Sequence, residues 1–330
     1  MRLPCRIGVI MPVYNMAQFI REAILSILDQ TYADFELLVV DDASSDNTCE
    51  IIKSLNDDRI TLVRNDSNRG LVYSLNFGLD YFDCEYVLRM DGDDVSLPDR
   101  FEKQVRFMDQ NPGVVLCGTQ AYWEEMDADL NIGNVHEWDY YLNDQDLRVS
   151  LIWGASFIHP SVIIRNHVLK SNNLIYDNTF TIACEDWHMW VRLSRFGKIA
   201  NLNERLVRYR IRKGSLHRSD PSLALKLNHQ VRQFYLHSFG LDESVIKTIL
   251  NAGEVKSNDF NDLILAYRIF LQKASGKLDI NCLRTQIGNR LVDAIKNNKL
   301  NVFYLFKVIV FGFRPDATYL KKALRYSLSR

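Results

Sequence analysis

Short apolar runs alternate with amphipathic segments over the first hundred residues of the chain. Residues 6–13 form a nearly continuous apolar run, typical of a buried parallel strand, and residues 17–30 space their apolar side chains like one face of a helix. The pattern continues with strands at 35–40, 60–64 and 86–90. One helix begins at 43–46, and two more span 71–81 and 100–109. This alternation predicts an α/β fold, with a mainly parallel sheet flanked by helices.

The pattern changes after Gly118. We expect a strand at 119–124, an acceptor-side insertion in the polar stretch 125–146, a strand at 161–164, a helix at 182–196 and a last edge strand at 205–211. From about residue 219 only helical periods remain, at 223–239, 244–250, 259–273, 281–296 and 300–311. The sequence therefore predicts two domains, an α/β domain over residues 1–215 and a helical appendage over 216–330.

Composition and charge narrow the class of protein. The chain of 330 residues is 47% hydrophobic and 25% charged, which is typical of a folded globular protein. Its sequence shows no apolar run long enough for a membrane-spanning helix and no signal-peptide pattern, so we expect a cytoplasmic protein. Its six cysteines lie far apart without a C-x-x-C pair, which favours separate reduced thiols. Residues 296–330 carry a net charge of +7 and the rest of the chain −8, which argues against a nucleic-acid partner.

The basic C-terminal segment also contains an apolar stretch at 302–311, interrupted by Lys307. A basic helix with an apolar face binds anionic lipid surfaces, so peripheral contact with the inner membrane is one interpretation. Simple packing within the helical domain is the other.

Acidic residues follow several of the predicted strands. In open sheets of this kind, ligands bind beyond the carboxyl ends of the strands. The five carboxylates expected on this rim are Asp41, Asp42, Asp91, Asp93 and Asp94. Because hard oxygen ligands suit Mn²⁺ or Mg²⁺, and because both Gly-rich phosphate-loop patterns are absent from the sequence, we expect a divalent cation to hold any phosphate group here.

A set of motifs in fixed order resembles the family 2 glycosyltransferases with the GT-A fold. The motifs are P-V-Y-N at 12–15, V-D-D-A-S-S-D-N-T at 40–48, N-R-G-L at 68–71, M-D-G-D-D-x-x-L-P-D-R at 90–100, I-H-P-S at 158–161, E-D-W-H-M-W at 185–190 and V-R-Y-R at 207–210. The resemblance covers about residues 6–215. Within the family, the chain is most similar to bacterial lipooligosaccharide and O-antigen β-1,3-N-acetylglucosaminyl- or galactosyltransferases.

The resemblance implies a nucleotide-sugar site and a metal site. Asp42 would contact the base or ribose, and the residues expected around the nucleotide-sugar are Pro12, Tyr14, Asn15, Asp42, Arg69, Asp91 and Gly92. Asp93 would bind the metal on the diphosphate, with Asp91 and His217 as further ligands. Two readings of Asp94 stay open, direct ligation and capping of the helix entered through Leu97 and Pro98.

The resemblance also implies a catalytic base, Asp186, supported by its neighbour Glu185. On the acceptor side, His159 would contact sugar or diphosphate, against the alternative of a structural histidine. Trp187 would stack on a sugar, although both it and Trp190 could equally be core residues. The basic residues Arg210, Arg212 and Lys213 beside His217 fit either a lid over the diphosphate or a solvated turn.

Together these implications describe a metal-dependent, inverting glycosyltransferase. The expected donor is a UDP-sugar, with UDP-GlcNAc first and UDP-galactose or UDP-glucose as alternatives, and the expected acceptor is a surface glycan or a lipid-linked glycan precursor. A non-catalytic nucleotide-sugar-binding protein is the competing interpretation, and the presence of Asp186 argues against it.

Overall fold

A computed structural model describes residues 5–127, 130–211, 221–252, 259–297 and 303–317. The chain divides into two compact units, which are treated separately below. The first comprises Met1–Asp144 and Ala155–Leu227, and the second comprises Gln145–Gly154 and Asn228–Arg330. The division falls twelve residues beyond the expected boundary at 215, and one segment from within the first 215 residues groups with the second unit.

A nine-stranded sheet forms the N-terminal unit, in the order β3-β2-β1-β4-β8-β6-β9-β5, with β7 paired to β6. Its strands are β1 (Ile7–Val13), β2 (Phe35–Asp41), β3 (Ile60–Arg64), β4 (Tyr86–Arg89), β5 (Val95–Ser96), β6 (Val114–Met126), β7 (Ile132–Trp138), β8 (Ile163–Arg165) and β9 (Lys198–Ile211). β1 pairs in parallel with both β2 and β4, and β2 pairs in parallel with β3. The carboxyl ends of β1, β2 and β4 therefore meet at one edge of the sheet.

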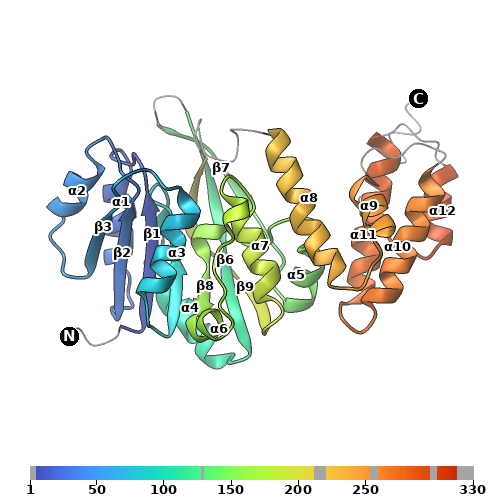
Figure 1. Ribbon diagram of the computed structural model, residues 1–330, viewed down its shortest axis with the longest axis horizontal. Helices are drawn as coiled ribbons and strands as arrows, with labels where there is room; N and C mark the ends of the chain where they lie inside the picture. The colour runs from blue at the N-terminus through green and yellow to red at the C-terminus, as the bar shows by residue number, and fades with distance from the viewer. Residues whose placement is uncertain (1–4, 128–129, 212–220, 253–258, 298–302, 318–330) are drawn as a thin grey trace. The chain divides into compact units, whose positions relative to one another are not determined.

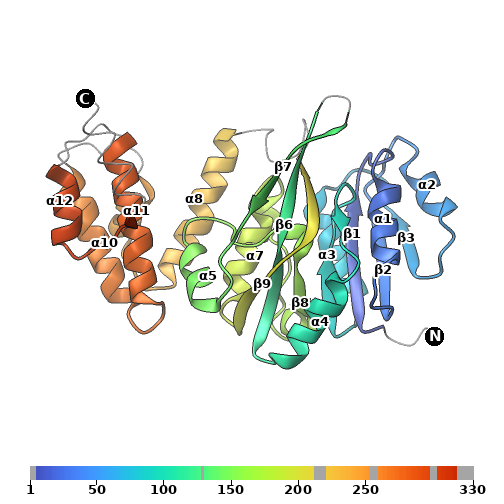
Figure 2. The same ribbon diagram turned by 180° about the vertical axis from the view of Figure 1, so that it is seen from behind.

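Helices cover both faces of this sheet. They are α1 (Ile20–Leu28), α2 (Thr48–Ser54), α3 (Leu71–Tyr81), α4 (Arg100–Gln110), α6 (Asn166–Ser171) and α7 (Glu185–Leu193). Figure 1 shows α3, α6 and α7 in front of the strands, and the reverse view in Figure 2 shows α1 and α4 on the other face. Fully buried side chains of α1 and α4, such as Ile24 and Phe101, join those of β1, β2 and β4 in one hydrophobic core.

One segment contains elements that the sequence did not indicate, and one prediction about a strand was wrong. The stretch 125–146 contains β7, which forms a hairpin with β6, and α5 (Asp144–Ser150). The predicted edge strand at 205–211 is the second half of β9, which pairs in parallel with β6 and, at Val207 and Arg208, antiparallel with β5. Val207 and Arg208 are therefore paired on both sides, and the two-residue β5 is the edge strand at this end of the sheet.

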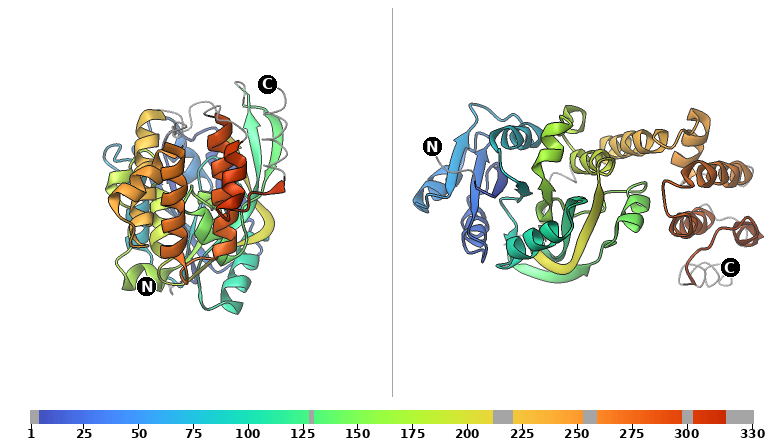
Figure 3. Two further views of the ribbon diagram at one scale, coloured as in Figure 1. Left: turned by 90° about the vertical axis from the view of Figure 1, so that its right-hand side faces the viewer. Right: turned by 90° about the horizontal axis from the view of Figure 1, so that it is seen from below.

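The C-terminal unit is helical, as predicted. It contains α9 (Glu243–Leu250), α10 (Phe260–Ala274), α11 (Ile280–Asn297) and α12 (Phe303–Val310), and α8 (Pro221–His237) enters it from the first unit. α10 packs against α9 and α11, and α11 packs against α12, as the orange and red helices in Figure 3 show. Within the part of the chain that the structure describes, every helix is too short or too polar to cross a bilayer.

Candidate active site

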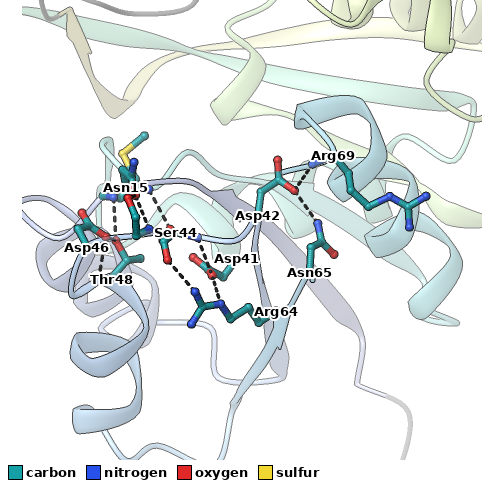
Figure 4. Close-up of polar contacts among 11 residues, drawn as sticks. Asn15, Asp41, Asp42, Ser44, Asp46, Thr48, Arg64, Asn65 and Arg69 are labelled. Atoms are coloured by element: carbon teal, nitrogen blue, oxygen red, sulfur yellow. Dashed lines mark hydrogen bonds and ion pairs between the residues drawn. The ribbon is translucent and has the colours of Figure 1, made fainter. Parts of the chain in front are cut away.

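The loops after β1 and β2 are tied together by hydrogen bonds between side chains and backbone amides (Figure 4). The Asn15 amide N–H donates to Ser44 Oγ at 2.9 Å, and Asn15 Oδ1 accepts from the Ser45 amide at 2.8 Å. Asp46 accepts from the amides of Ala17 and Thr48, both at 3.0 Å. Asn15 adopts a left-handed backbone with φ 53°, which Asn tolerates better than most residues. The loop that contains the predicted Tyr14 and Asn15, just after Pro12 in β1, is thus fixed before any ligand arrives.

Asp42 holds the loop that precedes α3. Its Oδ1 accepts from Asn65 Nδ2 at 2.7 Å and from the Arg69 amide at 2.8 Å, while Oδ2 accepts from the Gly70 amide at 2.7 Å. Gly70 has φ 87°, a conformation that favours glycine, and is the residue before α3. Asp42 is 5% exposed. The carboxylate therefore positions residues 65–70, including the predicted nucleotide contact Arg69, whose guanidinium lies 3.6 Å from the centre of the Tyr73 ring.

Asp41 faces a different environment from its neighbour. It is fully buried, and its Oδ2 accepts from the Ser44 amide at 3.1 Å and lies 3.3 Å from Arg64 Nε. Arg64 in turn donates to the Ser44 carbonyl at 2.7 Å. Asp41 supports the turn after β2, where Figure 4 shows it beside Arg64 and Ser44, and it is not part of the group formed by Asp91, Asp93 and Asp94.

Three of the predicted acids do gather after β4. Asp91, Asp93 and Asp94 each offer a carboxylate oxygen, and these oxygens lie within 4.8 Å of one another. Gly92 permits this turn, because a Cβ there would lie 2.8 Å from Val13 Cγ1 on the neighbouring strand. Arg89, the last residue of β4, forms a short ion pair with Asp91.

Burial and mutual repulsion raise the proton affinity of this cluster. The pKa of Asp91 is raised to about 6, chiefly by burial and also by Asp93, while Arg89 acts in the opposite direction. The pKa of Asp94 is raised well above its ordinary value by burial, then by Asp93 and Asp91. Burial disfavours a charged carboxylate, and a like charge nearby adds to the effect.

Asp94 provides the sharpest sign that the cluster suits a cation. It is 1% exposed, and its Oδ1 accepts from the Arg210 amide at 2.8 Å, but its buried Oδ2 has no hydrogen-bond partner among the described residues. The residue before α4 is Asp99, so Asp94 does not cap that helix and this reading of it was wrong. A buried, unpartnered carboxylate oxygen beside two further carboxylates fits a hard divalent cation such as Mn²⁺ or Mg²⁺.

The first turn of α7 carries two further acids, Glu185 and Asp186, and the charge of Glu185 acts on Asp91. Glu185 is 5% exposed, and its Oε1 lies 3.5 Å from His159 Nδ1. His159 Nε2 is 3.1 Å from the Tyr176 hydroxyl, so both ring nitrogens have protein neighbours. Burial raises the pKa of Tyr176, and the charges that act on it include Arg89, Glu185, Asp186 and Asp91. Tyr176 is therefore in electrostatic reach of both the acid cluster and α7.

Asp186 is partly exposed, unlike Glu185. Its Oδ1 accepts from the Trp187 amide at 2.6 Å, which fixes the carboxylate at the start of α7. Its charge also contributes to raising the pKa of the partly buried Tyr140 to about 12, after the larger effect of desolvation. Trp187 and Trp190 are 2% and 0% exposed, so both indole rings pack inside the protein in this structure.

Arg210 has a role that the sequence did not indicate. Its side chain is 4% exposed, lies 2.5 Å from Glu22 and 3.6 Å from Glu124, and donates to the Asp93 carbonyl at 3.3 Å. It braces the acid cluster and is not part of a solvated basic turn. Arg212, Lys213 and the predicted metal ligand His217 lie outside the described residues.

Sequence reasoning also missed Arg89 and Tyr176. Arg89 immediately precedes M-D-G-D-D. Because residues i and i+2 of a strand lie on the same side, this position could have indicated a contact between Arg89 and Asp91. Tyr176 lies in a loop, and no local pattern connects it with His159.

Comparison with known proteins identifies the family. The family model described as glycosyl transferase family 2 matches residues 8–171. An uncharacterized glycosyltransferase of Haemophilus influenzae is 31% identical over 256 residues, 74% of this chain and 78% of that protein. The chain belongs to glycosyl transferase family 2. The putative glycosyltransferase EpsE of Bacillus subtilis is 42% identical over 64% of this chain and 74% of its own length.

This family 2 chain also resembles solved structures. The structure of Staphylococcus aureus TarS residues 1–349 in complex with UDP-GlcNAc matches with a TM-score of 0.61 and 19% identity, over 92% of this chain and 90% of that one. A mannosyltransferase from Pyrobaculum calidifontis in complex with GDP-Man and Mn²⁺ matches with a TM-score of 0.51 and 16% identity, over 99% and 88%. The expected GT-A fold class with C-terminal helices is confirmed.

Proposed function

We propose that the protein is a metal-dependent, inverting glycosyltransferase that moves GlcNAc from UDP-GlcNAc to a hydroxyl of a surface-glycan or lipid-linked glycan acceptor. The observation that carries the proposal is the cluster of Asp91, Asp93 and Asp94, with the unpartnered Asp94 Oδ2, in a family 2 domain. UDP-glucose and UDP-galactose are the alternative donors. Among relatives, an Escherichia coli enzyme, UDP-Glc:alpha-D-GlcNAc-diphosphoundecaprenol beta-1,3-glucosyltransferase WfgD, is 28% identical over 64% of this chain and 79% of its own length.

In this proposal, Asp93 and Asp91 hold Mn²⁺ or Mg²⁺, with Asp94 completing the set of carboxylates. A divalent cation bound there would neutralise charge on the leaving diphosphate. Asp42 and the loop that it orders, including Arg69, bind the nucleoside. Arg89 and Arg210 keep the carboxylates of the cluster in place through the contacts described above.

Asp186 is the general base of the proposed reaction. The acceptor hydroxyl oxygen forms a bond to the anomeric carbon, the bond from that carbon to the UDP oxygen breaks, and the hydroxyl proton passes to the Asp186 carboxylate. Its partial exposure leaves it accessible to an acceptor, and the amide of Trp187 restricts its orientation. Glu185 positions the acceptor side through His159, which in turn contacts Tyr176.

Thermal unfolding with a panel of nucleotide-sugars, each with and without Mn²⁺, tests the donor and metal assignments. A ligand that binds only the folded state stabilises it by about 2.7 kcal/mol at a hundred times its dissociation constant. We expect a Mn²⁺-dependent increase in melting temperature with UDP-GlcNAc. The same response to UDP-glucose or UDP-galactose would replace the donor, and no response to any UDP-sugar would refute the UDP assignment.

A transfer assay with variants tests the base. Asp186→Asn should reduce turnover by roughly 10²- to 10⁴-fold while UDP-sugar binding stays within a factor of two to three. Asp80→Asn, an exposed acid on α3, is the matched control and should retain activity. If Asp186→Asn transfers sugar at the control rate, the base assignment is wrong. Normal UDP-sugar binding by a wild-type protein that transfers to none of the tested acceptors would favour the non-catalytic alternative.

We further propose that the end of α12 contacts an anionic membrane surface. Ile309, Val310 and Phe311 are 52%, 60% and 40% exposed, and the sequence continues with the basic residues Lys321, Lys322 and Arg325. Replacing Ile309 and Val310 by Ser should reduce sedimentation with phosphatidylserine-containing vesicles, whereas Leu225→Ser, at an equally exposed position on α8, should not. Equal sedimentation of both variants and the wild type would exclude this contact.

A further inference from the structure

Two arginines in the C-terminal unit lie against the same tryptophan ring. Trp153, just beyond α5, has the guanidinium carbon of Arg232 at 5.4 Å and that of Arg290 at 5.3 Å from its ring centre. Arg232 is on α8 and Arg290 on α11, and all three residues belong to the second compact unit. A guanidinium stacked on an aromatic face keeps the N–H groups at its edge available for hydrogen bonds.

The charges of these two arginines are not balanced by acids in contact with them. Within the described ranges, both lack a carboxylate within ion-pair distance, and the contact that each one makes is with Trp153. Arginines of the N-terminal unit have polar partners in the protein. The partly buried Arg208 and the buried Arg210 contact Glu124, and Arg165 donates to the carbonyls of Val114 and Met108.

Unsatisfied hydrogen-bond donors surround the same point. Tyr267, on α10, has its ring centre 6.3 Å from that of Trp153, is 1% exposed, and its buried hydroxyl has no partner among the described residues. Trp153 Nε1 and Arg232 Nε are also buried without a partner. Trp153 is therefore the common neighbour of all three side chains, because both guanidiniums and the Tyr267 ring lie within 6.3 Å of its ring centre. An unpaired buried donor is costly, and an acceptor brought by a ligand would remove that cost.

We propose that Trp153, Arg232, Tyr267 and Arg290 form a binding site for a phosphate-type oxyanion, separate from the donor site of the N-terminal unit. The polar groups that they contribute can all donate hydrogen bonds, and two are permanently positive. A phosphate or diphosphate group has two or more negative charges and oxygens that accept from a guanidinium in pairs, whereas a single carboxylate balances only half of this charge. The ligand class follows from this match and does not depend on the proposed sugar transfer.

Calorimetric titration of the full-length protein with inorganic pyrophosphate, in EDTA and at constant ionic strength, tests the site. EDTA suppresses metal-dependent binding to the acid cluster. We expect saturable binding that Arg290→Gln weakens roughly ten-fold or more, because it removes a charged donor, and that Tyr267→Phe weakens by a smaller factor, because it removes one hydroxyl. Arg290 is exposed, so its replacement should leave folding intact.

Arg268→Gln is the matched control. Arg268 is an exposed arginine of the same unit that stacks on Phe311 at 5.6 Å, and its variant should bind pyrophosphate like the wild type. Sedimentation with phosphatidic-acid vesicles, compared with phosphatidylcholine vesicles, distinguishes a lipid headgroup from a free phosphate as the source of the oxyanion. An Arg290→Gln defect in either assay supports the site. If Arg290→Gln and Tyr267→Phe match the wild type in both assays, the proposal is wrong.

Discussion

Asp42→Asn tests whether the carboxylate after β2 orders the loop that precedes α3. An asparagine side chain can place its oxygen where Oδ1 accepts from Asn65 and the Arg69 amide, but its NH₂ group then faces the Gly70 amide at the position of Oδ2. One hydrogen bond is lost, a donor is left facing a donor, and the two remaining bonds lose their charge assistance. For a site that is 5% exposed, we expect the loop to lose about 2 kcal/mol of local stability.

Hydrogen exchange measures this loss where it occurs. A change of about 2 kcal/mol corresponds to roughly 30-fold faster exchange of the Gly70 and Arg69 amides. Asp46→Asn is the matched control, since Asp46 also accepts from two amides but is exposed, so water can replace the lost contact. We expect a change of less than about five-fold at the amides of Ala17 and Thr48. Wild-type exchange at Gly70 in Asp42→Asn would refute the ordering role.

Asn65→Ala separates this ordering role from direct contact with the nucleotide. It removes one partner of Asp42 and keeps the carboxylate. If Asp42 acts through the loop alone, the two variants should lose UDP affinity in proportion to their loop exchange rates. A larger loss in Asp42→Asn at equal exchange would indicate that the carboxylate also contacts the ligand.

Three further perturbations probe burial and charge in the N-terminal unit. His188 is buried, and burial lowers its pKa to about 4. As pH falls below 6.5, the unfolded chain therefore takes up a proton at this side chain before the folded protein does. The free energy of unfolding should fall by about 3 kcal/mol between pH 6.5 and 4. His188→Gln should flatten that part of the curve of melting temperature against pH. Asp94→Asn should leave the metal-free protein as stable as the wild type or more stable, because a buried like charge is removed. The same variant should bind Mn²⁺ at least roughly ten-fold more weakly in titrations. Lower stability of the metal-free variant would contradict the cation assignment. Glu124→Gln should cost about 3 kcal/mol in urea unfolding by leaving Arg208 and Arg210 underpaired, against a change of about 0.5 kcal/mol for its exposed neighbour Glu125→Gln.

Local periodicity identified those elements whose buried face is visible in the sequence. β3 and α3 have the predicted bounds, because alternating or helical apolar spacing defines them without reference to the rest of the chain. β7 was missed because it is a polar, solvent-facing hairpin strand, in which Ile132 and Val135 are 44% and 52% exposed. The prediction that 205–211 forms an edge strand was also wrong. This segment is part of β9, and the pairing of β9 with both β6 and β5 depends on contacts distant in sequence.

The site was predictable where its residues are contiguous. Asp91, Asp93 and Asp94 share one turn, so the sequence placed them together. Asp41 and Asp42 are also adjacent, but successive residues at the end of a strand point to opposite sides, and the structure directs Asp41 into the turn beside Arg64. Partners brought from distant segments, such as Tyr176 with His159 and Arg210 with the acid cluster, had no local signal.

The charges around the acid cluster support the proposed binding of a cation. Arg89 is paired with Asp91, but the guanidinium of Arg210 is directed to Glu22, Glu124 and the Asp93 carbonyl, and Asp94 receives only the Arg210 amide. Arg89 thus offsets the charge of Asp91, while Asp94 has no guanidinium within ion-pair distance among the described residues. In the proposed function, Mn²⁺ or Mg²⁺ would offset negative charge that remains on the cluster, and the buried Asp94 Oδ2 would offer it an oxygen that no described donor occupies. The fold places these carboxylates at the carboxyl end of β4 and braces them with Arg89 and Arg210, so in the proposed function a bound cation would supply positive charge that the protein does not.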